Sequence, residues 1–316
     1  MQKPDILQIG PYPEWDQIPL DAAFSVHRYF EAADKPAFLA GVGARVRGIA
    51  TRGELGANRA MIEACPNLEV ISVYGVGFDA VDLDACRERG IRVTNTPDVL
   101  TNDVADLGVA MMLAQSRGMI GAESWVRDGS WANKGLYPLR SRVWGKKAGV
   151  LGLGRIGFEV AKRLSGFDLE IAYSDIAPKD YAADGWTYIA DPVDLARHAD
   201  FFFVTLAASA ATRHIVSREV IEAVGPGGMI VNISRASNID ENALLDALES
   251  RALGSAALDV FEGEPALNPR FLELDNVLLQ PHHASGTFET RKAMGQLVRD
   301  NLTAHFAGKP LLTPVL

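Results

Sequence analysis

Short apolar segments alternate with helix-like segments along almost the whole chain, and no other feature constrains the fold as strongly. Each apolar run is only a few residues long, whereas the segments between the runs repeat their hydrophobic residues every three or four positions. Strands joined through helices run parallel and are buried on both faces of their sheet. The sequence therefore predicts a doubly wound α/β fold with parallel sheets. The expected strands are residues 6–9, 48–50, 69–73, 92–95, 148–151, 170–174, 201–206, 229–233, 256–260 and 277–279.

Two breaks in this alternation indicate two domains, which suits a chain of 316 residues. A strand ends and a long helix begins near residues 96–98, and the chain leaves its last strand for a final helix near residues 285–287. We expect residues 99–285 to form one domain, inserted into a discontinuous domain made of residues 1–98 and 286–316.

The segment Gly152-Leu-Gly154-Arg155-Ile156-Gly157 fits the pattern G-x-G-x-x-G, with an apolar strand before it and an amphipathic helix after it. Gly152 permits a tight turn, Gly154 lets the backbone approach a pyrophosphate, and Gly157 lets the helix pack closely on the sheet. The start of the helix, at Arg155 and Ile156, presents N–H groups and a positive dipole end to phosphates. The segment predicts a dinucleotide site, and a glycine turn without a ligand is the alternative.

Asp175 ends the next strand, 23 positions after Gly152. A carboxylate there accepts hydrogen bonds from an adenosine ribose and repels a 2′-phosphate, which favours NAD over NADP. The next residue is Ile176 and not an arginine, but Lys179 lies nearby and leaves NADP open. An aspartate that merely ends a strand is the alternative interpretation.

A second glycine segment, Gly75-Val76-Gly77, also follows a strand, but the strand after it does not end in an acid. We expect its consecutive N–H groups to form a nest that binds a substrate carboxylate. Tyr74 would face the same space. A plain turn and a second nucleotide site are the alternatives.

Three side chains that suit one reaction follow three successive strands: Arg235, Glu264 and His282. The carboxyl ends of parallel strands share one edge of a sheet, where ligands bind, so we expect the three to converge. Reduction of a 2-oxo acid by NADH needs a proton donor and a cation. His282 suits the first role because imidazole titrates near neutral pH, and Glu264 would orient the ring and favour its protonated form. The planar fork of Arg235 suits the carboxylate.

Asp259 lies on the strand before Glu264 and is expected to bind the nicotinamide carboxamide. Taken singly, Arg235 could instead be an ordinary surface arginine after a strand, and Glu264 could instead be an ordinary turn residue. His283 should point away from His282 on an extended backbone. The sequence predicts no metal site.

Composition excludes several classes of partner. The net charge of −9 makes nucleic acid and anionic membrane surfaces poor partners, whereas a small anionic substrate needs only a local cation. The first residues lack the apolar core of a signal peptide, and the two cysteines, Cys65 and Cys86, cannot make a disulfide framework. We therefore expect a cytoplasmic protein.

Residues 118–145 show no clear periodicity of hydrophobic residues, yet they include Trp125, Trp131 and Trp144. Such a segment is either a packed surface loop or a subunit interface, since aromatic residues and arginine are enriched at interfaces.

Together these motifs resemble the D-isomer-specific 2-hydroxyacid dehydrogenases, most densely in residues 152–157, 231–235, 258–265 and 281–282. Residues 281–291 and 301–315 look like the glyoxylate/hydroxypyruvate and hydroxyphenylpyruvate reductases of that family. The resemblance implies a Rossmann cofactor domain inserted into a discontinuous, flavodoxin-like substrate domain, and a homodimer built on the cofactor domains. It also implies catalysis by Arg235, Glu264 and His282. Members of this subgroup often favour NADPH and carry Ser-Arg where this chain has Asp175-Ile176, whose charge favours NAD.

The expected function is NAD(P)H-dependent reduction of a small 2-oxo acid, such as glyoxylate or hydroxypyruvate, to the D-2-hydroxy acid. One alternative is a reductase of bulkier aromatic 2-oxo acids such as hydroxyphenylpyruvate. The other is a non-catalytic NADH-sensing binding protein, because such a protein would retain the same three residues.

Overall fold

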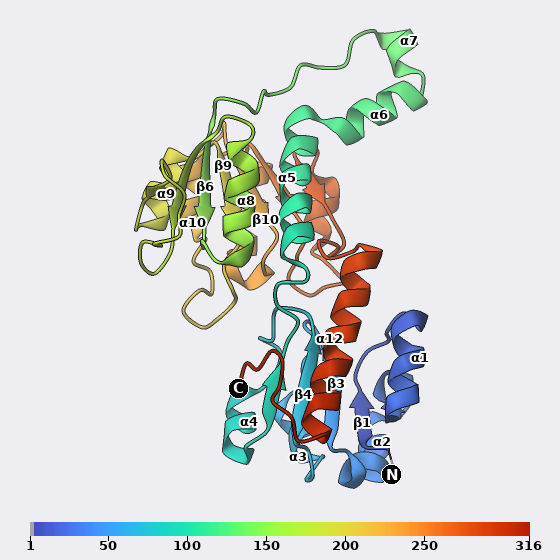
Figure 1. Cartoon of the computed structure of the whole chain (residues 1–316). Helices are drawn as coiled ribbons and strands as arrows, with labels where there is room; N and C mark the ends of the chain where they lie inside the picture. The colour runs from blue at the N-terminus through green and yellow to red at the C-terminus, as the bar shows by residue number, and fades with distance from the viewer. Residues whose placement is uncertain (1–2) are drawn as a thin grey trace. The chain divides into compact units, whose positions relative to one another are not determined.

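The computed structural model describes residues 3–316, which form two compact units (Figure 1). Unit 1 comprises the chain up to Leu100 together with Ser285–Leu316, and unit 2 comprises Thr101–Ala284. The limits expected from the sequence, residues 98 and 286, lie within two positions of these. Over residues 3–316, no helix combines the length and the apolar character needed to cross a membrane.

Unit 1 is built on a five-stranded sheet in which all neighbouring strands are parallel. In spatial order the strands are β2 (Ser25–Arg28), β1 (Asp5–Gln8), β3 (Gly48–Arg52), β4 (Val70–Tyr74) and β5 (Arg92–Thr94). The strand β2 was not predicted from the sequence. This strand lies at the edge of the sheet and every residue in it is half-buried, so it has no continuous apolar run.

Helices cover both faces of this sheet. One face carries α2 (Lys35–Val42), α3 (Arg59–Glu63) and α4 (Leu83–Arg89). The other carries α1 (Glu14–Ala23) and α12 (Phe288–Phe306). Ile49 and Ile71 of the sheet are fully buried together with Ile62 of α3. Side chains alternate along a strand, so Gly48 faces the opposite way, where a Cβ would lie 3.3 Å from the ring of Phe306.

Unit 2 contains a seven-stranded sheet that is also wholly parallel. Its spatial order is β12 (Val277–Leu279), β11 (Ser255–Leu258), β10 (Met229–Asn232), β9 (Phe201–Val204), β6 (Lys147–Leu151), β7 (Glu170–Ser174) and β8 (Thr187–Tyr188). The strand order reverses between β9 and β6, which creates the switch point where such sheets bind ligands. The predicted fold class is confirmed, and only the two-residue β8 was missed in this unit.

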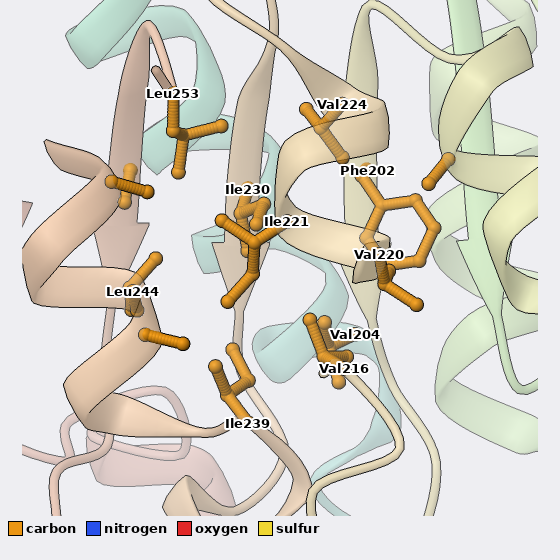
Figure 2. Packing of buried hydrophobic residues seen from close by; sticks show 14 of the residues in the cluster. Phe202, Val204, Val216, Val220, Ile221, Val224, Ile230, Ile239, Leu244 and Leu253 are labelled. Atoms are coloured by element: carbon orange, nitrogen blue, oxygen red, sulfur yellow. The ribbon is translucent and has the colours of Figure 1, made fainter. Parts of the chain in front are cut away.

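Both faces of this sheet are also covered by helices. One face carries α5 (Thr101–Arg117) and α8 (Arg155–Ser165), and the other carries α9 (Pro192–His198), α10 (Arg218–Val224) and α11 (Glu241–Glu249). Figure 2 shows the second interface, where Phe202 and Ile230 of the sheet meet Ile221 of α10 and Leu244 of α11. All four side chains are buried, so this core holds the strand ends in fixed positions.

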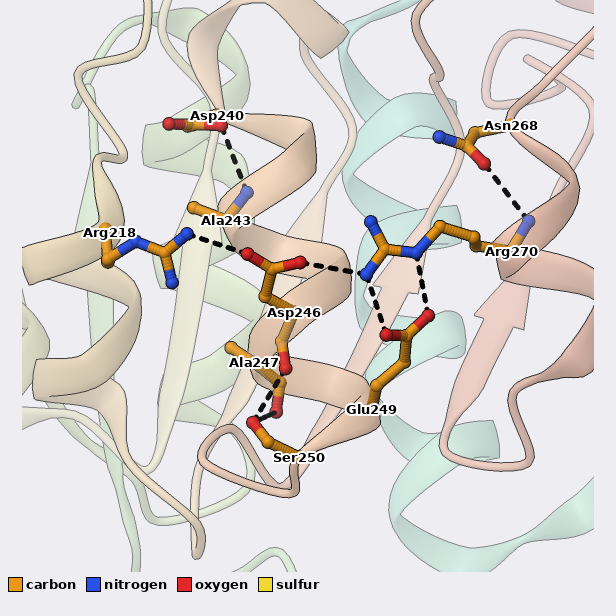
Figure 3. Close-up of polar contacts among 9 residues, drawn as sticks. All are labelled: Arg218, Asp240, Ala243, Asp246, Ala247, Glu249, Ser250, Asn268 and Arg270. Atoms are coloured by element: carbon orange, nitrogen blue, oxygen red, sulfur yellow. Dashed lines mark hydrogen bonds and ion pairs between the residues drawn. The ribbon is translucent and has the colours of Figure 1, made fainter.

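An ion-pair network fastens the segment between β11 and β12 to α11. Arg270, in the short helix η4 (Pro269–Glu273), donates hydrogen bonds to both carboxylate oxygens of Glu249 at 2.7 Å and to Asp246 at 2.9 Å (Figure 3). Asp246 also accepts a hydrogen bond from Arg218 of α10 at 2.8 Å.

The other 3-10 helices within residues 3–316 are η1 (Tyr29–Glu31), η2 (Gly43–Arg45) and η3 (Ala236–Asn238).

Residues 118–145 include two helices, α6 (Met119–Arg127) and α7 (Ser130–Lys134), that stand away from the sheet of unit 2 (Figure 1). None of the residues of α6 is buried. The large apolar side chains after it are mostly exposed, at 60% for Trp131, 88% for Leu136 and 99% for Leu139. Because these helices have no core to face within unit 2, their sequence shows no clear hydrophobic period.

Candidate functional site

The carboxyl ends of the strands of unit 2 lie at one edge of its sheet, and the candidate residues of this unit lie at or just after those ends. β10, β11 and β12 are neighbours, so the segments that carry Arg235, Glu264 and His282 lie side by side. β6 and β7, also neighbours, lead into residues 152–157 and into Asp175. The segments that carry the three side chains therefore meet at one sheet edge within one unit, and the catalytic role of these side chains stays a prediction.

Arg235 stands in a turn that a buried amide side chain shapes. The Oδ1 atom of Asn232, at the end of β10, accepts hydrogen bonds from the Ser234 N–H at 3.0 Å and the Ser234 hydroxyl at 2.8 Å. The Asn232 amide group donates to the carbonyl oxygen of Arg235 at 3.1 Å, and the Arg235 Nη1 donates to the Ser234 carbonyl oxygen at 2.8 Å. The guanidinium is thereby held at the strand end and remains only half-buried. Asn232 was not among the residues predicted from the sequence, although a buried asparagine ending an apolar strand is itself a signal of a structured turn.

Glu264 joins the strand ends of β11 and β12 through the ring of His282. Its Oε2 atom lies 2.6 Å from Nδ1 of His282, and its Oε1 accepts a hydrogen bond from the Phe261 N–H at 2.8 Å. Both oxygens are therefore engaged, and the imidazole is fixed in one orientation with Nε2 at its far edge. A carboxylate on Nδ1 is the arrangement that keeps the second ring nitrogen available for proton transfer.

The pKa of the Glu264 carboxyl lies below its ordinary value. Burial raises this pKa, but the hydrogen bonds from His282 and from the Phe261 N–H outweigh burial, and the positive charge of Arg235 adds to their effect. Glu264 is therefore an ionised partner for His282 at neutral pH. The contribution from Arg235 also indicates that the guanidinium lies near this pair.

The backbone at His282 adopts a left-handed conformation, with φ of 50°, which is strained for a residue with a side chain. Asp259, 1% exposed at the end of β11, fixes the chain that follows it. Its two carboxylate oxygens accept hydrogen bonds from the N–H groups of His283 at 2.7 Å and Ala284 at 2.9 Å. Burial raises the pKa of Asp259, and these two N–H groups oppose the rise. Asp259 thus positions the histidine turn, and its contact with a nicotinamide stays a prediction.

The glycine segment forms a tight turn between β6 and α8. Gly152 has a φ of 96°, and a Cβ at Gly157 would lie 2.0 Å from the Gly152 carbonyl oxygen, so neither position accepts a side chain. Gly154 is the residue before α8, and a Cβ built on it meets nothing within 4 Å. The helix α8 therefore begins at Arg155 with open space beside Gly154. This geometry fits the pyrophosphate of a dinucleotide.

Asp175 lies beside this glycine turn. Its Oδ2 accepts a hydrogen bond from the Leu153 N–H at 2.9 Å, which ties the end of β7 to the turn after β6. Its Oδ1 accepts from the Ile176 N–H at 2.8 Å and lies 2.9 Å from Nζ of Lys179. The carboxylate thus occupies the position expected of a ribose-binding acid, together with a cation that the sequence analysis noted only as nearby.

The second glycine segment belongs to unit 1 and follows β4. The Gly75 N–H donates to the hydroxyl of Thr96 at 3.0 Å, and the Gly75 carbonyl oxygen accepts from the Thr96 N–H at 2.9 Å. The expected nest therefore cannot use the Gly75 N–H, because that group is already bonded. The N–H groups of Val76 and Gly77 make no hydrogen bond within residues 3–316, so they are the two left for an anion.

Tyr74 belongs to a buried polar cluster that was not predicted from the sequence. Its hydroxyl donates to the Arg291 carbonyl oxygen at 2.6 Å and lies 3.3 Å from Oδ2 of Asp16. Asp16 is 1% exposed and pairs with Arg299 at 2.8 Å. Gly295 of α12 makes room for this carboxylate, since a Cβ there would lie 2.0 Å from Oδ1 of Asp16. The members lie far apart in the sequence, and no local pattern relates them.

The chain is similar to known proteins over most or all of its length. Residues 109–284 match the family model described as the D-isomer specific 2-hydroxyacid dehydrogenase, NAD binding domain. The hydroxyphenylpyruvate reductase of Plectranthus scutellarioides is 43% identical over 316 residues, which cover 100% of both chains. The solved structure of a 2-hydroxyacid dehydrogenase from Ketogulonicigenium vulgare Y25 is 76% identical with a TM-score of 0.93, covering 100% of this chain and 99% of that one. The structure of an NADPH-dependent glyoxylate/hydroxypyruvate reductase from Sinorhizobium meliloti, in complex with NADP and malonate, is 39% identical with a TM-score of 0.93, covering 99% of this chain and 97% of that one.

Proposed function

The chain belongs to the D-isomer specific 2-hydroxyacid dehydrogenase family, as its motifs suggested, and we propose that it reduces glyoxylate or hydroxypyruvate to the D-2-hydroxy acid. It is an NAD(P)-dependent oxidoreductase that acts on 2-oxo acids. We assign unit 2 to the dinucleotide and unit 1, with residues 74–77, to the substrate. The assignment of the glyoxylate and hydroxypyruvate class draws on the reductase from Sinorhizobium meliloti.

In the proposed mechanism, three side chains of unit 2 divide the work. The guanidinium of Arg235 binds the substrate carboxylate and polarises the ketone, since its planar fork grips two oxygens at once. The Nε2–H of protonated His282 donates its proton to the carbonyl oxygen, which becomes the hydroxyl of the product. Glu264 stabilises the imidazolium before this transfer and holds the ring in place. When bound, the reduced nicotinamide supplies a hydride to the carbonyl carbon.

The observation that carries this proposal is the 2.6 Å contact between Nδ1 of His282 and Oε2 of Glu264, close to Arg235 at one sheet edge. A steady-state assay tests it: the purified protein is given NADH with glyoxylate, hydroxypyruvate or hydroxyphenylpyruvate, and the loss of NADH absorbance is followed. We expect turnover with at least one of the two small acids. Absence of turnover with every acid, with either NADH or NADPH, would reject the proposal.

A second candidate substrate is an aromatic 2-oxo acid. The specific observation in its favour is the 43% identity, over the whole chain, to the hydroxyphenylpyruvate reductase of Plectranthus scutellarioides. The same assay separates the two. A kcat/KM for hydroxyphenylpyruvate well above that for hydroxypyruvate would assign the aromatic acid as the preferred substrate.

We propose NADH as the preferred cofactor. Support comes from the Asp175 carboxylate beside the glycine turn, because a negative charge at that position favours a ribose hydroxyl over a phosphate. The reductase from Sinorhizobium meliloti, a relative of this chain, is NADPH-dependent.

We also propose a homodimer in the cytoplasm. Support for the dimer comes from α6, α7 and the segment after them, where Trp131, Leu136 and Leu139 are exposed apolar side chains of the kind that subunits bury. Support for a reducing compartment comes from Cys65 and Cys86, which are both buried and unpaired.

A further inference from the structure

We propose that Lys179 is a specificity-determining residue for the cofactor. Its ammonium offsets the charge of Asp175, so that a ribose site which prefers the 2′-hydroxyl of NADH also accepts the 2′-phosphate of NADPH. This inference rests on the dinucleotide site assigned above and deepens it at the adenosine end, away from the reacting groups.

The Asp175 carboxylate already binds three donors. Its Oδ2 accepts from the Leu153 N–H at 2.9 Å, and its Oδ1 accepts from the Ile176 N–H at 2.8 Å and faces Nζ of Lys179 at 2.9 Å. A carboxylate offers about four acceptor positions. One position therefore remains for a ribose hydroxyl while all three protein donors stay in place, and NADH can bind without moving Lys179.

The Lys179 backbone is anchored, whereas its side chain can turn. The Lys179 N–H donates to the hydroxyl of Tyr173, on β7, at 3.0 Å, which fixes the start of the side chain beside the sheet. The ammonium group is 2.9 Å from Asp175 at the end of a flexible four-carbon stem. Its three N–H donors exceed the one that Asp175 uses, so two can reach a phosphate.

The combined charge of Asp175 and Lys179 allows the site to accept a 2′-phosphate as well. A lone carboxylate repels a 2′-phosphate, but the carboxylate and the ammonium together carry no net charge. The hydrogen bond to Asp175 raises the pKa of Lys179, so the ammonium keeps its charge at neutral pH. Ile176, the next side chain, is fully exposed. An added phosphate therefore meets a locally neutral pair with a cation that can turn toward it.

Cofactor binding without substrate tests the inference. NADH and NADPH are titrated separately by fluorescence, and calorimetry is done with adenosine 5′-monophosphate and adenosine 2′,5′-bisphosphate, which differ only in the 2′-phosphate. Replacing Lys179→Met should weaken NADPH and the bisphosphate by about tenfold or more, the size of one lost hydrogen bond to a charged group. NADH and the monophosphate should change by less than about twofold, and Lys179→Arg should retain NADPH binding.

Lys162→Met is the matched control, because Lys162 is an exposed lysine of α8 that pairs with Glu159 and not with Asp175. It should leave all four affinities unchanged. The inference is overturned if Lys179→Met weakens NADH and NADPH equally, if it weakens neither, or if the wild type binds NADH but not NADPH. These results are independent of the reductase assay, so a protein that discriminates the nucleotides as expected but reduces no 2-oxo acid would refute only the proposed substrate.

Discussion

His282 can serve as a proton donor only if its ring is held in one orientation, and Glu264 provides that constraint. One carboxylate oxygen faces Nδ1 of His282 at 2.6 Å and the other accepts the Phe261 N–H at 2.8 Å, so the carboxylate cannot rotate away. The strained φ of 50° at His282 adds a cost that the surrounding contacts must offset. His282 is therefore a proton donor held in one orientation, and the negative charge of Glu264 favours the protonated form of its ring.

Replacing Glu264→Gln should lower kcat by about tenfold or more while KM for the 2-oxo acid changes little, since an amide orients the ring but no longer favours the imidazolium. Stopped-flow and steady-state rates measure the effect. His283→Gln is the matched control, because the His283 side chain is exposed. Equal losses in the two variants would contradict the role of Glu264.

The same carboxylate predicts a pH dependence of stability. The folded-state pKa of Glu264 is lowered, so its contribution to folding is present above the ordinary glutamate pKa of about 4.3 and is lost as pH falls through the folded-state value. Urea unfolding of the wild type and of Glu264→Gln should therefore give free energies that converge as pH falls below about 4. If the difference between the two free energies of unfolding grew toward low pH, the predicted pH dependence would be wrong.

The residues that could be predicted from the sequence are those whose position follows from one strand. Arg235, Glu264 and His282 each come after an apolar run, and the rule that parallel strands share a carboxyl edge brings them together. The bonds of Gly75 with Thr96 and of Asp175 with Lys179 could not be predicted in the same way, because they depend on how loops fold back on strand ends.

At the scale of elements, α1, α12 and β4 are joined by charge as well as by apolar packing. Asp16 on α1 and Arg299 on α12 form an ion pair, 1% and 12% exposed, under the hydroxyl of Tyr74 at the end of β4. Burial raises the pKa of Tyr74, so its hydroxyl stays protonated and donates to the Arg291 carbonyl oxygen. The cluster fixes the start of the segment to which we assign the substrate carboxylate.

Replacing Arg299→Met should destabilise the protein by about 3–5 kcal/mol, because it leaves the buried Asp16 carboxylate without its partner. Urea denaturation followed by circular dichroism measures the loss. The control is Arg87→Met, which breaks an exposed pair with Asp84 and should cost less than about 1 kcal/mol. Comparable losses for both variants would show that the buried pair of Asp16 and Arg299 stabilises the protein no more than the exposed pair of Arg87 and Asp84.

Elements with a hydrophobic period or a continuous apolar run were predicted, and those without one were not. β6, β9 and β10 lie in the middle of their sheet and read as apolar runs in the sequence. β2 and β8 lie at sheet edges, where pairing on one side and partial exposure remove the pattern. α6 has no buried residue, so its helix cannot be read from periodicity.

At the scale of the whole molecule, the proposed dimer accounts for the exposed apolar side chains of residues 119–144. Light scattering should give twice the chain mass of 34.1 kDa. Replacing Leu136→Glu and Leu139→Glu together should yield a monomer with little change in its own folding, since the two side chains are 88% and 99% exposed. Leu272→Glu, at a 66% exposed position of η4, is the control and should stay dimeric. A wild-type monomer, or a dimer that survives the double change, would reject this interface.

The most direct test of the central claim follows the hydrogen itself. The protein is incubated with hydroxypyruvate and NADH deuterated on both C4 positions, and the product is examined by mass spectrometry and chiral chromatography. We expect D-glycerate carrying one deuterium on C2, with formation abolished or strongly slowed in Arg235→Ala. Formation of the L-isomer, or product without deuterium at C2, would contradict it.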